Sequence, residues 1–160
     1  MVRKNQERMH CNTLEELDRA YIAGLVDADG CIQISKRCPG KRTNYALEVT
    51  VSNTDTRIIN YLKNTVGGGV KEDIRRHRKL VCFGWVITSS AAMELLEQIK
   101  PYLQSKKDEA EISIIFQQMP RIQGKHKSAI EWQIDEILYN KCRELKHSRG
   151  ISISSQGGQQ

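Results

Sequence analysis

The chain has 160 residues, 39% hydrophobic and 28% charged, and its 25 lysines and arginines against 19 acidic residues give a net charge of +6. This length suits one domain with a sizeable core, and no apolar run approaches the ~20 residues of a membrane span, which excludes a transmembrane protein. The positive charge favours nucleic acid as a partner. The first ten residues carry no apolar signal segment, so we expect an intracellular protein with a basic tail over residues 1–12.

The cysteines argue against both a zinc site and a disulfide framework. There are five, at Cys11, Cys31, Cys38, Cys82 and Cys142, and no two form a CxxC pair. An odd number at wide spacing in a chain of this size is typical of free thiols in a reducing compartment.

The first predicted element is a helix that ends in acidic residues. Thr13 followed by Glu16 is a capping-box pattern, and apolar residues then recur at helical spacing at Leu14, Leu17, Tyr21, Leu25 and Ala28. We expect the helix to end near Ala28 or Asp29, with Gly30 as its stop. Asp27 and Asp29 then face the negative end of the helix dipole, which costs roughly 0.3–1 kcal/mol each, so a bound cation is expected to offset them.

The pattern then changes to period two, which predicts strands. Ile32 and Ile34 alternate with Gln33 and Ser35, and after a loop around Pro39 the apolar residues Tyr45, Leu47, Val49 and Val51 alternate with Ala46, Glu48, Thr50 and Ser52. Thr54 or Asp55 can cap a short second helix, which Gly67–Gly69 end. A second hairpin is predicted over about 70–74 and 80–88, with Phe83, Trp85 and Ile87 on the core face and the basic run 75–79 at its tip.

Three further helices complete the predicted order α-ββ-α-ββ-α-α-α. Ser89 or Ser90 caps the first, which continues to Pro101, and the second covers about 106–119. The last covers about 127–146 and is expected to bury Ile130, Ile134, Ile137, Leu138 and Leu145. This order predicts an α+β fold in which a four-stranded antiparallel sheet has its helices on one face. We expect one domain over 13–147 and a disordered tail over 148–160.

Asp29 is a candidate metal ligand because it sits at the end of a packed, rigid helix. Hard divalent cations prefer carboxylate oxygens, but a single carboxylate is a poor site. Gly24 and Ala28 lie four residues apart on one helical face and allow a symmetry-related helix to approach, which would bring two Asp29 carboxylates together. A calcium-binding loop counted from Asp27 is excluded, because its sixth and twelfth positions would be Ile32 and Cys38.

The segment IAGLVDADG, Ile22–Gly30, closely resembles the signature of the LAGLIDADG homing endonucleases, with Ile for Leu and Val for Ile. The resemblance implies a saddle-shaped sheet and, since one motif is present, a homodimer that contacts through Tyr21, Gly24, Leu25 and Ala28. It implies that Asp29 and the Ala28 carbonyl bind Mg²⁺ or Mn²⁺, with Ca²⁺ binding without supporting cleavage.

The same resemblance assigns two more positions. PYLQSKKDEA, starting at Pro101, matches the family segment that carries an active-site lysine, which implies Lys106 as a catalytic residue with Lys107 as the alternative. SNTD, starting at Ser52, matches the place of a polar residue that holds the attacking water. Asp55 is the better match there and Asn53 the alternative, although a role as N-cap explains Asp55 equally well.

The exposed sheet face is the predicted surface for reading double-stranded DNA. Its candidate residues are Gln33, Ser35, Arg37, Glu48, Thr50, Ser52, Lys71, Asp73 and Arg75, with Arg76, Arg78 and Lys79 placed for phosphates. The resulting hypothesis is a site-specific endonuclease that promotes mobility of an intron or intein, in an organelle or a prokaryotic cytoplasm. An intron maturase that binds RNA and a non-catalytic DNA-binding regulator are the alternatives.

Overall fold

The computed structural model describes residues 10–37, 43–73, 81–120 and 127–151. Its elements follow the predicted order: α1 (Glu16–Asp29), β1 (Gly30–Arg37), β2 (Asn44–Asn53), α2 (Thr56–Thr65), β3 (Gly69–Asp73), β4 (Cys82–Thr88), α3 (Ser89–Ile99), a 3₁₀ turn η1 (Lys100–Tyr102), α4 (Lys107–Gln118) and α5 (Ala129–Ile151). The predicted basic run 75–79 and Cys38 lie outside the described residues. No helix in the described part is long and apolar enough to cross a membrane.

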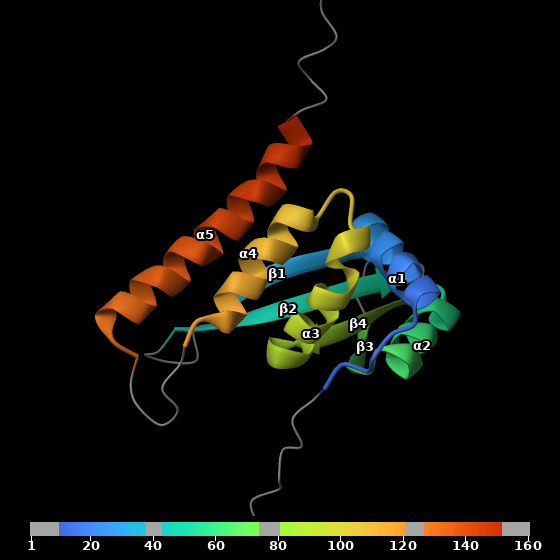
Figure 1. Cartoon of the computed structure of the whole chain (residues 1–160). Coiled ribbons are helices and arrows are strands. Elements are labelled where there is room, and N and C mark those ends of the chain that lie inside the picture. The colour runs from blue at the N-terminus through green and yellow to red at the C-terminus, as the bar shows by residue number, and fades with distance from the viewer. Residues whose placement is uncertain (1–9, 38–42, 74–80, 121–126, 152–160) are drawn as a thin grey trace, which may run out of the picture.

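The four strands form one antiparallel sheet in the order β1-β2-β4-β3. β1 is therefore an edge strand, and α5 runs beside it while also packing on α4 (Figure 1). The register pairs Gly30 with Val51 and Arg37 with Asn44. The α+β class and the hairpin arrangement predicted from the sequence are confirmed.

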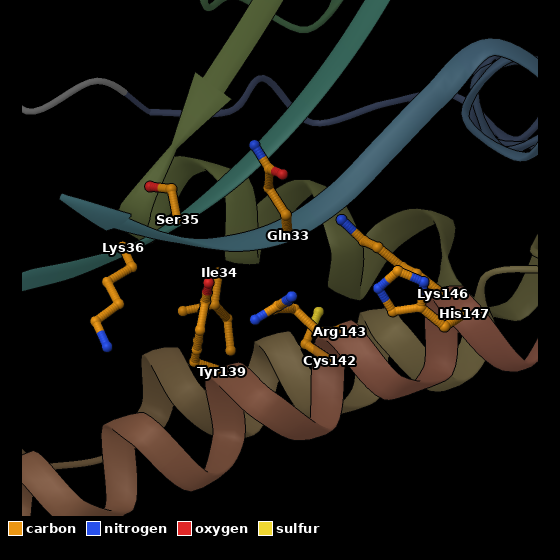
Figure 2. A pocket seen from close by; sticks show the side chains of 9 residues that line it. All are labelled: Gln33, Ile34, Ser35, Lys36, Tyr139, Cys142, Arg143, Lys146 and His147. Carbon is orange, nitrogen blue, oxygen red and sulfur yellow. The ribbon is translucent and has the colours of Figure 1, made fainter.

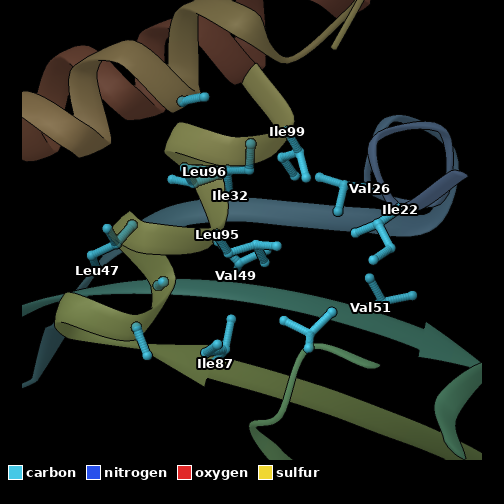
Figure 3. Packing of buried hydrophobic residues seen from close by; sticks show 14 of the residues in the cluster. Ile22, Val26, Ile32, Leu47, Val49, Val51, Ile87, Leu95, Leu96 and Ile99 are labelled. Carbon is cyan, nitrogen blue, oxygen red and sulfur yellow. The ribbon is translucent and has the colours of Figure 1, made fainter. Parts of the chain in front are cut away.

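One hydrophobic core lies between the helices and a single face of the sheet. Leu47, Val49 and Val51 are fully buried and pack with Ile22 and Val26 of α1 and with the leucines of α3 (Figure 3). Trp85 and Ile87 share this face as predicted, and Phe83 packs against the core while partly exposed. Since α2, α4 and α5 also contribute to this same cluster, the opposite face of the sheet is left to polar side chains.

The start of α1 differs from the prediction. The helix begins at Glu16 with Glu15 as its N-cap and no side-chain cap bond, so the predicted capping box at Thr13 is wrong. The preceding segment is instead tied to α3, because the backbone N–H groups of Cys11 and Leu14 donate to Glu94 (3.0 Å) and Gln98 (2.8 Å). Residues 10–12, expected to belong to a tail, are thus docked on the domain.

Three predictions about the later helices are also wrong. Thr88, and neither Ser89 nor Ser90, is the N-cap of α3. In α5 the expected core residues Ile130 and Ile137 are 67% and 65% exposed, while Cys142 and Asp135 are buried. The face of α5 that packs is set by Trp132 and Tyr139, whose rings contact Tyr45 of β2. The helix also continues to Ile151, past the predicted end near Lys146.

The prediction of free thiols can be compared with the structure for the four described cysteines. Cys11, Cys31, Cys82 and Cys142 are free thiols. Burial and the nearby Glu94 carboxylate raise the pKa of Cys11 to about 11, and burial also raises the pKa of Cys142. These two thiols therefore behave as small packing groups.

Candidate functional site

The end of α1 is joined directly to the first strand. α1 ends at Asp29, Gly30 opens β1, and the Gly30 N–H donates to the Val26 carbonyl. A Cβ at position 30 would lie 2.6 Å from the Val26 Cα and 2.7 Å from its carbonyl oxygen. Glycine is required here by this close approach, since its backbone is extended and not left-handed. The strand is thereby held against the last helical turn.

Asp27 fastens this helix end to the loop before α4. Its carboxylate accepts hydrogen bonds from the backbone N–H groups of Gln104 (2.7 Å), Ser105 (3.3 Å) and Lys106 (3.1 Å), and from the Ser105 hydroxyl (3.1 Å). Partial burial raises the pKa of Asp27, but these donors outweigh it and the pKa is lowered overall. Asp27 therefore supports the loop that precedes α4.

Lys106 completes the connection in the opposite direction. Its ammonium donates to the backbone carbonyls of Val26 (2.7 Å), Asp27 (2.8 Å) and Gly30 (2.8 Å). A lysine at the negative end of a helix is favourable, and its ammonium adds hydrogen bonds to the carbonyls at this helix end. The cation expected to offset the acidic helix end is thus, at least in part, Lys106 itself. We call this two-way connection of Asp27 and Lys106 the helix-end clamp.

Asp29 is exposed and makes one hydrogen bond to a neighbouring side chain. The Asn53 amide donates to its carboxylate at 3.2 Å, and the Asn53 amide oxygen accepts from the Asp55 N–H at 2.9 Å. Asn53 therefore orients Asp29 from the end of β2.

Asp55 is occupied as the N-cap of α2. Its carboxylate accepts from the Arg57 N–H at 2.9 Å and forms an ion pair with the Arg57 guanidinium at 2.6 Å. These hydrogen bonds from Arg57 lower the pKa of Asp55 to about 2. The structure brings Asn53, and not Asp55, to Asp29, so the cap accounts for Asp55 and the site role predicted for this segment fits Asn53 better.

The outer face of α1 has an apolar stripe that the protomer leaves uncovered. Tyr21 is 49% exposed, Leu17 is 85% exposed, and Ala28 is exposed. A Cβ at Gly24 would meet no other described atom within 4 Å. Leu25, the fourth predicted contact residue, is partly buried against the core. Leu17 was not predicted as a contact residue, although its spacing of seven from Gly24 places it on the same face.

The polar sheet face presents most of its predicted residues. Arg37, Ser52 and Lys71 are exposed, and Gln33, Ser35 and Thr50 are partly exposed. The structure does not describe the side chain of Asp73, nor the residues Arg75, Arg76, Arg78 and Lys79.

Glu48 differs from the other residues of this face, since it is only 7% exposed. It accepts a hydrogen bond from Gln33 at 3.4 Å and forms an ion pair with Arg37. Glu48 therefore orients two neighbouring side chains from the adjacent strand, and its carboxylate is largely committed to them. This contact network argues against the predicted role of Glu48 as a direct reader of bases.

A divalent cation fits the exposed Asp29 carboxylate in donor type, since its oxygens are the ligands that hard cations prefer. Within the described part of one protomer, no group of three or more His, Cys, Asp or Glu side chains could hold a metal. A complete site built on Asp29 therefore needs oxygen donors from outside the protomer, such as a second Asp29 or phosphate groups.

A family model described as LAGLIDADG endonuclease matches residues 22–134, more than half of the chain. No curated protein sequence matches the chain.

Three solved structures with the same fold are remote in sequence. The homing endonuclease I-CvuI, in complex with the I-CreI target in the presence of Mg with the DNA not cleaved, is 20% identical over 91% of this chain and 86% of its own, with a TM-score of 0.69. I-CvuI with its own target and Ca is 21% identical over 81% and 82%, with a TM-score of 0.70. The archaeal intron-encoded I-Vdi141I, complexed with DNA, is 12% identical over 91% and 88%, with a TM-score of 0.68.

Proposed function

The chain belongs to the LAGLIDADG endonuclease family, and from this premise we propose that it acts as a homodimeric, divalent-metal-dependent homing endonuclease that cuts both strands of a long, partly palindromic DNA site. We further propose that cutting promotes the mobility of an intron or intein.

The dimer is proposed to form through the uncovered stripe of α1. Leu17, Tyr21, Gly24 and Ala28 are neighbours on one helical face, and the open space beside Gly24 allows a second helix to come close. A twofold axis along this contact would bring the two α1 ends together, and with them the two Asp29 carboxylates.

Asp29 and the Ala28 carbonyl are the proposed metal ligands, and Mg²⁺ or Mn²⁺ is the proposed ion. When bound, such a cation stabilises charge on the scissile phosphate and lowers the pKa of water that it coordinates. Asn53 holds the Asp29 carboxylate in place through its amide. Lys106 is proposed as a positioning residue, because its ammonium binds three carbonyls at the helix end and so fixes where Asp29 stands.

The sheet is proposed to lie in the major groove. β2 has ten residues, which span roughly 33 Å at ~3.3 Å per residue, so each protomer could follow on the order of ten base pairs. A two-stranded ribbon fits the ~12 Å groove. Arg37 and Gln33 are the proposed base readers on β1, with Glu48 setting their orientation, and Ser35, Thr50, Ser52 and Lys71 are proposed further contacts.

One observation carries this proposal: an exposed carboxylate stands at the end of a helix that a lysine has already stabilised. The test is a supercoiled plasmid that carries the uninterrupted allele of the host gene, incubated with protein and Mg²⁺. We expect linear product from the native protein, and none from Asp29→Asn, which should still shift the same DNA in a gel.

The other outcomes separate the alternatives. A protein that binds its precursor RNA and cuts no DNA is a maturase. A protein whose DNA-dependent activity is the same in Asp29→Asn is a regulator. Either result would refute the endonuclease.

A further inference from the structure

A second, unassigned basic site lies beside the edge strand. A groove of about 410 Å³ separates β1 from α5, and every charged side chain among its described lining residues is basic (Figure 2). Those side chains are Lys36 from β1 and Arg143 and Lys146 from α5, and His147 of α5 lines the groove beside them. Because α5 residues at spacings of three and four share a face, these three side chains of α5 line the groove together.

The positive charge of Lys36 is already paired and is not available to a ligand in this groove. Its ammonium lies 2.8 Å from a Glu136 carboxylate oxygen, and it also lies over the rings of Tyr45 and Tyr139. Its role is to hold α5 on the end of β1.

Arg143 and Lys146 are different, because no carboxylate in the described part of the chain lies within ion-pair distance of either. The Arg143 guanidinium carbon lies 5.6 Å from the Tyr139 ring centroid, a contact that orients the side chain and leaves its N–H donors available. The acidic neighbour Glu144 is directed to Lys141, 3.8 Å away.

Lys146 carries its charge to the polar face of the sheet. Its ammonium lies 3.1 Å from the Cys31 sulfur, and Cys31 lies on that face together with Gln33 and Ser35. In Figure 2 the Lys146 side chain extends from α5 toward Gln33. Positive charge therefore reaches the plane of the polar face at the edge of β1.

We propose that Arg143 and Lys146, with His147 beside them, bind a phosphodiester of the DNA backbone. This rests on the proposed function. If the ribbon β1–β2 fills a major groove ~12 Å wide, the phosphates that border the groove pass along the outer edge of β1, and β1 is an edge strand with α5 beside it. A phosphate bound between Arg143 and Lys146 would meet two cations and no carboxylate among the described residues that line the groove. Such a contact fixes the register of the duplex and carries no sequence information.

The test measures how binding of a fluorescein-labelled duplex of arbitrary sequence depends on salt. The full chain, Arg143→Gln/Lys146→Gln and each single variant are compared with Lys141→Gln, which removes the same charge from a position of α5 outside the groove. Each lost phosphate contact should reduce the slope of log K against log[salt] by about 0.9, so the fall in affinity between 50 and 200 mM salt becomes smaller by about 3.5-fold per contact. The loss of affinity should be equal for duplexes of different sequence.

Each outcome decides one question. Reduced slopes in the groove variants, with Lys141→Gln like the native chain, support the site. Groove variants that match Lys141→Gln overturn it, even though the native chain binds DNA. A native chain that binds no duplex at all overturns the proposed function instead. If the double variant does not fold, the single variants and Lys146→Arg, which should keep the slope, give the same decision.

Discussion

Replacing Gly24 with leucine tests whether α1 is the contact between protomers. Inside one protomer the change is mild, because a Cβ at Gly24 meets no other described atom within 4 Å. Leucine is the better helix former, so the protomer should gain about 0.8 kcal/mol. In the proposed dimer the same side chain would stand where two helices touch.

The expected effect on the dimer is large and opposite in sign. Overpacking a close contact costs typically about 1–3 kcal/mol, and a twofold axis places the substitution on both helices, so the dimer loses about 2–6 kcal/mol. Each 1.4 kcal/mol is a factor of ten in Kd. The dimer Kd should therefore rise by roughly 30-fold to 10⁴-fold, while the protomer itself becomes more stable.

Sedimentation equilibrium over a range of concentrations measures the dimer Kd, and urea unfolding at a concentration where the protein is monomeric measures the protomer. Asn140→Leu on the exposed side of α5 is the control for adding a surface leucine. A Gly24→Leu protein that dimerises as tightly as the native chain would refute the assignment of this helix face. So would a native protein that stays monomeric on DNA.

Three further predictions concern the contacts around the site. Lys106→Met removes an ammonium bound to three carbonyls and should lower the free energy of unfolding by about 2–4 kcal/mol. The same change at the exposed neighbour, Lys107→Met, should alter the free energy of unfolding by no more than about 0.5 kcal/mol. Equal effects of the two changes in urea unfolding would contradict the helix-end clamp. The lowered pKa of Asp27 stabilises the fold above the unfolded-state value of about 3.9, and this is lost as the pH falls through the folded-state value. The Tm difference between the native chain and Asp27→Asn should therefore shrink below about pH 4. A difference that does not change with pH would contradict a stabilising role of the Asp27 carboxylate. Glu48→Gln removes the carboxylate that orients Arg37 and should weaken discrimination between the cognate duplex and one changed at the contacted base by up to about 1–3 kcal/mol, which an unchanged ratio of the two affinities would rule out.

The fold could be predicted where each strand has one buried and one polar face. Leu47, Val49 and Val51 are fully buried, and Ser52 and Thr50 on the other face are exposed or partly exposed. This alternation is local, so the residues alone define it. Asp55 was foreseen as a helix cap for the same reason, since a cap involves residues only two positions apart.

Helical periodicity alone does not show which face of a helix is buried. Leu17, Tyr21 and Ala28 recur at helical spacing, yet they lie on the exposed face of α1, while Ile22, Ala23 and Val26 form the buried one. A helix that is apolar on two sides offers two stripes, and periodicity does not tell which faces the core. α5 presents the same difficulty, because packing on Tyr45 selects its buried face.

The helix-end clamp could not have been read from the sequence as a contact. Asp27 and Lys106 are 79 positions apart, and the bonds between them involve backbone groups, which no side-chain pattern records. Local reasoning did identify the need for the clamp, because an acidic helix end requires positive charge nearby. It assigned that charge to a metal, whereas the chain supplies part of it with Lys106.

The two aspartates of the motif should consequently respond in opposite directions to the same substitution. Asp27 is bound by four donors, so Asp27→Asn should destabilise the fold. Asp29 adds negative charge to a helix C-terminus, which costs roughly 0.3–1 kcal/mol, and asparagine can still accept the one bond from Asn53. Asp29→Asn should therefore raise Tm by roughly 1–4 °C in EDTA, and by more if two Asp29 meet in a dimer.

If the native Asp29 weakens the fold and its loss abolishes cutting, then its chemical role, and not its packing, explains why an aspartate stands at this position. Thermal unfolding of the native chain, Asp27→Asn and Asp29→Asn in EDTA decides the point. With Mg²⁺ added, the native chain should gain Tm relative to Asp29→Asn, because a ligand stabilises only the form that binds it. If Asp29→Asn instead lowers Tm in EDTA as Asp27→Asn does, Asp29 has a structural role and the argument for a metal at this helix end loses its basis.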